Sequence, residues 1–424
     1  MEFIPEFHGG ITFFYSSNPD NIQSNSQNDN DDKYYCRILK KSLAETLTDF
    51  YPIAGRFKDT STIDCNDSGA CVVEAKLNSN LSDFLLSVSK SREDPHKKLG
   101  KLVPTLDSET MELASKCMLI AQITIFECRG VAISFCLEHR FCDLSSVVVF
   151  LKCWSARARG DAGEIVVPDL VGSSFLPPLD LPPLPPVPNP IENRTTARLV
   201  FDASKISALK TKFAESANGN DHDQYNKYPS RVEVVLALIL KCAISAARSI
   251  TPETKSVVFQ SVNLRKRTVP PLPENSIGNL FWMLPVTIGE GNNIEFHELV
   301  SKMKSETTLF YEETVRRIKG DEEGNSLVFE SVKEREEILK SASDVDIYWC
   351  SSWCRFPLYE MDFGWGKPVW VSSGVVSSRN LIVFEDTKCG DGIQAWVTLD
   401  PQVMAVFERD EEIMSFASFN HSIA

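Results

Sequence analysis

The chain has 424 residues, of which 43% are hydrophobic, so most of it is expected to be folded. A chain of this length predicts two domains, each large enough to bury its own core. Its 44 basic and 58 acidic side chains give a net charge of −14, which argues against a broad nucleic-acid-binding surface and means that any anionic ligand would need a local basic patch.

The first half of the chain alternates strand and helix patterns. A two-residue period of apolar side chains predicts strands, a spacing of three or four residues predicts helices, and Gly, Pro or Asn clusters predict turns. The predicted elements are a strand at 11–15, a polar loop at 18–33, a helix at 36–50, a hairpin of 61–64 and 71–75 around a turn at 66–69, a second hairpin of 118–127 and 131–138 turned at 129–130, and a helix from about 143 to 157.

A proline-rich segment at residues 176–190 separates this half from the next. Proline lacks the backbone N–H and fixes φ, so no packed element is expected there, and we predict an extended crossover between two domains. A recognition segment for a partner domain is the alternative. We favour the crossover because folded-looking sequence resumes at once at Ala197.

The second half repeats the alternation of strands and helices. Ser230 and Glu233 form a capping box that predicts a helix start. The predicted elements are strands at 197–201, 256–264, 280–288, 346–352, 369–373, 381–386 and 393–399, helices at 204–215, from 230, at 295–319, 332–341 and 401–416, and a polar loop at 217–228. Both halves therefore indicate an α/β protein, without an internal repeat in the sequence.

The cysteine spacing and the N-terminal residues indicate the cellular compartment in which the protein is expected. None of the twelve cysteines forms a Cys-x-x-Cys pair, and the Cys350 to Cys354 spacing has no histidine near it in sequence, so we expect reduced thiols and no metal site. Residues 1–17 lack a basic region followed by a hydrophobic core, so no signal peptide is expected. No apolar run is long enough to span a bilayer. These features predict a cytoplasmic protein, and we expect a monomer.

The residues Glu138-His-Arg-Phe-Cys-Asp143 connect a predicted strand to a predicted helix. His139 therefore lies on a backbone fixed from both sides, which suits an imidazole that transfers protons. The plainer interpretation is a packing or surface histidine, with Asp143 as the N-cap of the following helix.

A second motif, Asp362-Phe-Gly-Trp-Gly366, places two glycines around a tryptophan, so the backbone there can turn tightly or approach a ligand closely. A structural loop with Trp365 filling the core is the alternative. For Asp362 and Phe363 we favour this structural role.

With these two motifs, in this order and at this separation, the chain resembles the plant BAHD acyl-CoA-dependent acyltransferases over nearly its whole length. Supporting segments are Tyr51-Pro-Ile-Ala-Gly-Arg56, Asp64-Cys-Asn-Asp-Ser-Gly69, Asn263-Leu-Arg-Lys-Arg267, Gly278-Asn279 and Ser352-Trp-Cys-Arg355. Within the family, the chain is most similar to the vinorine-synthase-like branch, which acylates alkaloid and terpenoid alcohols, commonly with acetyl-CoA.

The resemblance implies two chloramphenicol-acetyltransferase-like domains of mixed sheet flanked by helices. Residues 1–175 would form the N-terminal domain, 176–195 the crossover and 196–424 the C-terminal domain. A channel between the domains would carry His139 near its middle, open to acyl-CoA from one face and to the acceptor alcohol from the other. No cofactor would be bound permanently, because acyl-CoA is a co-substrate.

The resemblance also implies residue roles. The Nε2 atom of His139 would accept the proton of the acceptor hydroxyl within a ternary complex, and Asp143 would form a structural ion pair, for which Arg265 is the best candidate. The Trp365 indole N–H is a candidate oxyanion donor, although a purely architectural role stays open. Asp362, Gly364 and Gly366 would form the structural part of their motif.

Coenzyme A phosphates need cations or free N–H groups. Ser230 and Arg231, at a helix start, offer both, and Lys266 can add a charge beside Arg265 and Arg267. Simple helix capping is the competing interpretation for Ser230.

Two departures from the family pattern bear on the channel. Leu144 stands where members usually carry Gly or Ala, so it is expected to narrow the channel or shift the turn. The chain opens at Met1-Glu-Phe-Ile-Pro5, without the amino-terminal segment that members carry before the strand at Ile11, a segment that normally contributes a strand and part of the channel wall.

Other activities stay open at this stage. The segment Ile277-Gly-Asn-Leu280 lacks the Tyr-Phe-Gly-Asn-Cys pattern of flavonoid malonyltransferases, which argues against a malonyl donor without excluding it. The same base would serve an amine, and a catalytically silent small-molecule-binding relative is a further alternative. An esterase is disfavoured because the chain has no Gly-x-Ser-x-Gly elbow.

Overall fold

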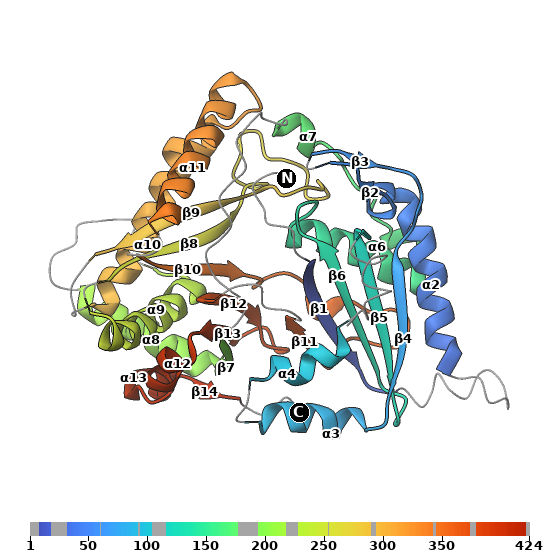
Figure 1. Cartoon of the computed structure of the whole chain (residues 1–424), viewed down its shortest axis with the longest axis horizontal. Coiled ribbons are helices and arrows are strands. Elements are labelled where there is room, and N and C mark those ends of the chain that lie inside the picture. The colour runs from blue at the N-terminus through green and yellow to red at the C-terminus, as the bar shows by residue number, and fades with distance from the viewer. Residues whose placement is uncertain are drawn as a thin grey trace.

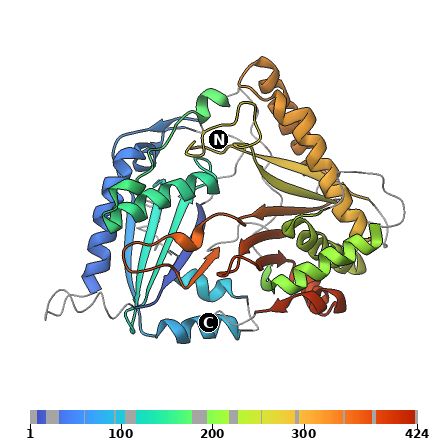
Figure 2. The same ribbon diagram turned by 180° about the vertical axis from the view of Figure 1, so that it is seen from behind.

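Two β-sheets lie side by side in the computed structural model, each with helices against it (Figures 1 and 2). The structure describes residues 8–17, 32–59, 61–91, 94–103, 116–176, 194–217, 228–252, 254–289, 294–341, 345–373 and 379–420. Both sheets contain parallel and antiparallel pairs, so the α/β class and the mixed sheets are confirmed.

The first sheet has five strands, and all but one come from the first half of the chain. In spatial order they are β11 (Trp370–Ser373), β1 (His8–Tyr15), β6 (Val131–Glu138), β5 (Leu119–Phe126) and β4 (Cys71–Leu77). β5 and β6 form the predicted hairpin, and all their side chains are buried because helices or other strands cover both faces.

The second sheet has seven strands from the second half. In spatial order they are β14 (Ser418–Phe419), β7 (Thr195–Phe201), β13 (Ile393–Leu399), β12 (Leu381–Asp386), β10 (Val345–Ser352), β8 (Lys255–Asn263) and β9 (Phe281–Ile288). β10 runs parallel to both of its neighbours, and the remaining pairs are antiparallel.

Helices are distributed over both halves of the chain. Those of the first half are α2 (Asp32–Asp49), α3 (Leu81–Ser89), α4 (His96–Leu99), α6 (Leu144–Arg159) and α7 (Gly172–Phe175). Those of the second half are α8 (Ala203–Ala217), α9 (Arg231–Ile250), α10 (Phe296–Leu309), α11 (Glu322–Lys340), α12 (Pro401–Phe407) and α13 (Glu411–Phe416).

Separate apolar cores hold these layers together. α2 and α6 bury their apolar sides with β1, β5 and β6. α9 is buried along most of its length between the second sheet and the helices α8, α10, α12 and α13. A third core, to which Phe14, Leu85, Trp370 and Trp396 belong, joins α3 and the first sheet to β12 and β13 of the second. The two sheets therefore meet in a shared apolar core.

One predicted hairpin is wrong. Residues 61–64 and 71–75 do not pair with each other, because Ile63–Asp64 (β3) pairs with Arg56–Phe57 (β2), while β4 joins the first sheet in parallel with β5. Arg56 helps to set this arrangement, since its guanidinium donates to the carbonyl oxygens of Gly55 and Gly69.

Three helix bounds also differ from the prediction. The single helix expected at 401–416 is two helices, because Asp410 caps a new start and accepts from the backbone N–H groups of Glu412 and Ile413. α11 begins ten residues before the predicted Val332, where Asp321 caps it. The helix predicted at 295–319 is α10 followed by a π-turn (Phe310–Thr314) and a 3-10 turn (Val315–Arg317).

The chain does not divide cleanly at the proline-rich segment. Residues 177–193, most of the predicted crossover, lie outside the described residues, as do 18–31 and 218–227 of the predicted polar loops. After β10 the chain returns to the first half, and β11 pairs with β1 in the register Ile11 with Ser373 and Phe14 with Trp370. The boundary at residue 196 stays a prediction, and residues 370–373 belong to the first sheet.

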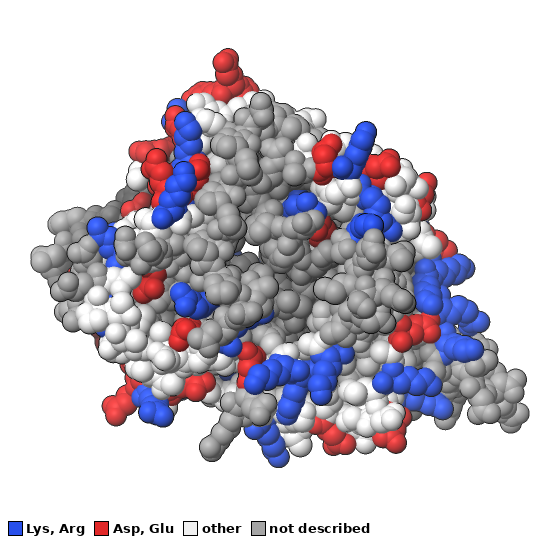
Figure 3. All heavy atoms as spheres, viewed as in Figure 1, with Lys and Arg blue, Asp and Glu red and all other residues white. Residues whose placement is uncertain are grey.

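Charged side chains of both signs are spread over the face in Figure 3, and Lys and Arg gather there over α3 and α4 and along α2. All twelve cysteines are free thiols. Within the described ranges, no three His, Cys, Asp or Glu side chains are placed to hold a metal ion, and no helix is long and apolar enough to cross a membrane.

Candidate active site

The junction between β6 and α6 is fixed by its own capping chemistry. Asp143 has an extended backbone and is the N-cap of α6, and its Oδ1 accepts from the Ser146 backbone N–H at 3.0 Å. The same oxygen lies 2.9 Å from the Ser146 hydroxyl. Residues 139–143 are therefore held between a buried strand and a capped helix, as the sequence predicted.

A buried ion pair attaches this junction to the second half. Arg265 Nη1 lies 2.7 Å from Asp143 Oδ2, and Arg265 Nη2 lies 3.0 Å from Asp143 Oδ1, so the pair is bidentate. The two residues are only 2% and 7% exposed. The guanidinium also donates to the carbonyl oxygens of Ser276 and Gly278. The predicted contact is confirmed, and both oxygens of Asp143 are occupied by structural partners.

His139 lines a cavity, and its ring lies 6.1 Å from that of Phe281 between centroids. Burial lowers the pKa of the imidazole below its ordinary value, while the backbone carbonyl of His139 itself and then the carboxylates of Asp143 and Glu138 act in the opposite direction. The imidazole is therefore neutral at pH 7, the state that can accept a proton.

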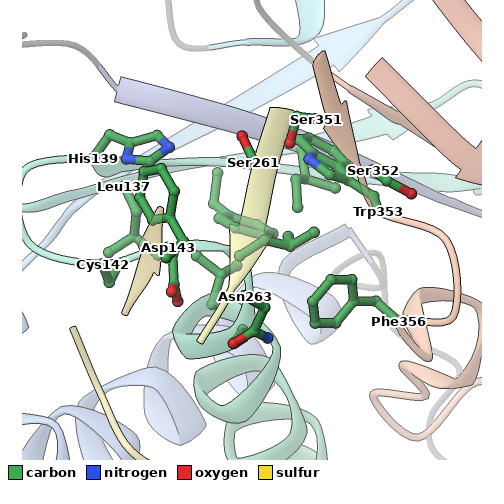
Figure 4. Close-up of a pocket in the computed structure, with 16 residues that line it drawn as sticks. Leu137, His139, Cys142, Asp143, Ser261, Asn263, Ser351, Ser352, Trp353 and Phe356 are labelled. Carbon is green, nitrogen blue, oxygen red and sulfur yellow. The ribbon is translucent and has the colours of Figure 1, made fainter. Parts of the chain in front are cut away.

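The cavity lies between the two sheets and measures about 120 Å³. Figure 4 shows side chains from both halves converging on it. From the first half it is lined by Ile11, Phe135, Leu137, His139, Cys142, Asp143, Leu144, Ser145 and Val147; from the second, by Ser261, Asn263, Phe281, Ser351, Ser352, Trp353 and Phe356. This is several times the volume of a water molecule but well below the volume of roughly 300 Å³ that starts the range for drug-sized ligands.

The lining is mostly apolar and carries several hydroxyls. Ser261, Ser351 and Ser352 line the cavity together with His139 (Figure 4). Among the described lining residues there is no Lys or Arg. Such a chamber can hold a small uncharged group beside an imidazole.

The residues 362–366 form a tight turn away from this cavity. Asp362 Oδ1 accepts from the backbone N–H groups of Gly364 and Gly366 at 2.7 and 2.9 Å, and both glycines have positive φ, +108° and +105°. The structural role proposed for Asp362, Gly364 and Gly366 agrees with these contacts, because glycine adopts that backbone without strain.

Trp365 lies in the core of the first half. Its ring centroid is 4.9 Å from that of Tyr35 and 6.1 Å from that of Tyr15, and it stacks on Phe363. Trp365 is not among the residues that line the His139 cavity. The predicted role as an oxyanion donor is therefore corrected, because the indole sits in an aromatic cluster, which agrees with the architectural alternative.

The residues predicted to bind coenzyme A already have other partners. Ser230 forms the predicted capping box with Glu233. Arg231 pairs with Asp386 at 2.9 Å and donates to the carbonyl oxygens of Gly390 and Asp391. Lys266 pairs with Glu274 in an exposed ion pair. None of the three lines the His139 cavity, so the structure does not bring them together with the candidate base.

Several site residues carry no periodic signal that sequence reasoning could use. Asn263 donates to the Ser145 hydroxyl at 2.7 Å, across the boundary between the two halves. Asn279 donates to the carbonyl oxygens of His139 and Arg140. The resemblance included Asn263 and Asn279 in its supporting segments, and that was the only sign of their importance.

A family model described as "Transferase family" matches residues 19–414. The chain belongs to this family, the BAHD acyltransferases. It is an acyl-CoA-dependent O-acyltransferase.

Other BAHD members align over most of the chain. Akuammiline synthase 1 of Alstonia scholaris is 38% identical over 90% of this chain and 85% of the relative. A 17,18-epoxy-17-hydroxycur-19-ene N-malonyltransferase of Strychnos nux-vomica is 33% identical over 96% and 82%, respectively. Stemmadenine O-acetyltransferase of Catharanthus roseus is 33% identical over 95% and 88%.

The crystal structure of the BAHD enzyme vinorine synthase superposes with a TM-score of 0.78 at 30% sequence identity, covering 97% of this chain and 91% of that one. The fold predicted from the sequence and its likeness to the vinorine-synthase branch are therefore confirmed.

Proposed function

We propose that this BAHD enzyme transfers an acetyl group from acetyl-CoA to a hydroxyl of an alkaloid or terpenoid, with His139 as the general base. The observation that carries the proposal is the half-buried imidazole, its pKa lowered by desolvation, in a small, mostly apolar cavity between the two halves. The similarity to stemmadenine O-acetyltransferase supports both the donor and the acceptor class.

Within a ternary complex, Nε2 of His139 accepts the proton of the acceptor hydroxyl while the oxygen attacks the thioester carbonyl. The tetrahedral intermediate then collapses with cleavage of the C–S bond. The imidazolium returns its proton to the departing thiolate, which leaves as coenzyme A. His139 is therefore neutral again at the end of each turnover.

The oxyanion of this intermediate needs a hydrogen-bond donor, worth on the order of 3 kcal/mol of barrier when preorganised. The hydroxyls of Ser261, Ser351 and Ser352 are our candidates, because all three line the cavity with His139. Asp143 would act through the backbone, since its carboxylate is engaged by Arg265.

The lining of the cavity favours an acetyl over a malonyl donor. A malonyl group carries a carboxylate, and an anion buried without a counter-charge is strongly disfavoured. No Lys or Arg is found among the described lining residues. The N-malonyltransferase among the relatives makes malonyl transfer, including transfer to an amine, the second candidate. We further propose that the enzyme acts as a cytoplasmic monomer, which its twelve free cysteines support as to location.

Thiol release from acetyl-CoA or malonyl-CoA, measured with a panel of alcohols and amines, tests this function. His139→Ala should lower kcat by about 10²- to 10⁴-fold, the usual contribution of a general base. His297→Ala, on α10 and outside the cavity, is the matched control and should leave turnover unchanged. Undiminished transfer by His139→Ala would overturn the proposal. Saturable ligand binding without thiol release by the wild type would favour a silent binding protein.

A further inference from the structure

Asn279 connects the second half of the chain to the backbone of the candidate base. It lies between β8 and β9, and its Nδ2 donates to the carbonyl oxygen of His139 at 2.6 Å and to that of Arg140 at 2.9 Å. Because two acceptors face one nitrogen, only the amide end of the side chain fits there. Its Oδ1 is buried and has no hydrogen-bond partner among the described residues.

The neighbours of Asn279 hold the same junction. The backbone N–H of Gly278 donates to the Ser146 hydroxyl at 3.0 Å, and that of Leu280 donates to Asp143 Oδ2 at 3.1 Å. Three consecutive residues of the second half therefore contact the segment 139–146 of the first. Asn279 is the one of the three that contacts His139 itself.

The carbonyl group held by Asn279 belongs to His139 itself, whose imidazole lines the cavity. Fixing the direction of that carbonyl fixes the backbone from which the ring extends, and with it the position of the ring.

We propose that Asn279 is a positioning residue, which sets the orientation of the His139 ring by holding the carbonyl group of that residue. The inference rests on the proposed function of His139 as the base. Asn279 does not line the cavity, so its effect reaches the reaction only through the backbone at 139–140.

Two substitutions remove the donor in different ways. Asn279→Ala deletes the amide, and Asn279→Asp keeps its shape but aims a carboxylate at two carbonyl oxygens. We expect kcat to fall by about 10- to 100-fold in each, because a misplacement of about 1 Å can cost 10²-fold in rate. The KM for acetyl-CoA should change less than about twofold, since substrate contacts are intact.

Asn275→Ala is the matched control. Asn275 lies in the same loop, and its Nδ2 likewise donates to a backbone carbonyl of the first half, that of Val167 at 2.7 Å, which lies outside the segment 139–146. Its kcat should equal that of the wild type. A purely structural role for the loop would make Asn275→Ala and Asn279→Ala equally harmful, which would overturn the inference.

A spectroscopic readout separates positioning from a loss of folded protein. The chain has six histidines, so ¹⁵N-histidine labelling with His139→Ala as the assignment reference can identify the His139 ring. We expect one set of His139 ring signals in the wild type and shifted or broadened ring signals in folded Asn279→Ala. An unchanged ring signal or an unchanged kcat in Asn279→Ala, with His139→Ala inactive, refutes the inference alone; full activity of His139→Ala refutes the proposed function.

Discussion

At the level of single residues, the site combines a neutral imidazole with a fully engaged ion pair. His139 is kept uncharged because burial opposes protonation, and Asp143 stays bound to Arg265 through both oxygens. The two motif residues thus have different tasks. His139 exchanges a proton, and Asp143 maintains the backbone that holds His139 in place.

The depressed pKa of His139 predicts the pH dependence of the rate. A base acts when it is neutral, so kcat/KM should stay level from pH 8 down past about 6.5, the ordinary imidazole value, and should fall only at lower pH. Initial rates at constant ionic strength, with enzyme checked for folding at each pH, give this profile. An apparent pKa at or above 6.5 in kcat/KM would contradict the prediction.

Loss of one partner of the buried ion pair should be costly. In Asp143→Ala the guanidinium of Arg265 loses its counter-charge, and we expect the free energy of unfolding to fall by about 3–5 kcal/mol. Glu274→Ala breaks the exposed pair with Lys266 and should cost about 1 kcal/mol or less. Urea unfolding of both variants measures the difference, and similar losses in the two would argue against this account.

Sequence reasoning placed His139 at the junction because strand and helix periodicity converge there, whereas the ion pair of Asp143 with Arg265 was inferred from the resemblance to the family. It failed for Trp365, since a motif gives a residue's order in the chain and not the layer in which it packs. The ion pair of Arg231 was not foreseen either, because its acceptors, Asp386 and the carbonyl groups after it, lie more than 150 residues away in sequence.

At the level of elements, local signals predicted most strands and helices, but partners of strands were harder to infer. The hairpin at 61–75 failed because β4 pairs with β5, whose position in the sheet is set by long-range contacts. The break in the helix at 401–416 did carry a signal, since Asp410 can cap a new helix. The prediction missed this break because the helical spacing of apolar residues continues without interruption over 401–416.

The turn at 362–366 gives a prediction about glycine. Gly366 has a φ of +105°, and no other atom lies within 4 Å of the place that a Cβ would take, so Gly366→Ala should be destabilising through backbone strain alone, by about 1–3 kcal/mol. Gly100 has a φ of −58°, which alanine adopts easily, and Gly100→Ala should be neutral or stabilising by up to about 1 kcal/mol. Thermal unfolding compares the two variants, and a neutral Gly366→Ala would contradict the argument.

For the whole molecule, a buried polar network helps to hold the two sheets together. Glu385, on β12, accepts from the Ser373 backbone N–H of β11 at 2.8 Å and from the side chains of Gln394 and Trp396 on β13. Gln394 in turn accepts from Arg198 and from Trp370. The strand that the second half contributes to the first sheet is therefore also bonded to the second sheet.

This network predicts a pH-dependent stability. Burial raises the pKa of Glu385 to about 7, with Arg198 and Tyr359 as its charged and titratable neighbours. Because folding raises this pKa, the contribution of Glu385 to the free energy of unfolding is complete below about pH 4.5, the ordinary value for glutamate, and is lost as the pH rises through 7. Glu385→Gln does not titrate, so its deficit relative to the wild type should shrink between pH 5 and 8 by up to about 3 kcal/mol. Urea unfolding at each pH measures this deficit, and a constant value would refute the prediction.

The return of β11 to the first sheet has a consequence for dissection of the enzyme. A piece ending within the proline-rich segment would leave β1 without the partner that covers its outer edge, and a bare strand edge invites aggregation. Produced in the same cells, the two pieces should find each other, because the later one brings the missing strand. Reconstitution of activity from such fragments, and its failure when residues 370–373 are deleted, would show that the halves are interlocked rather than merely adjacent.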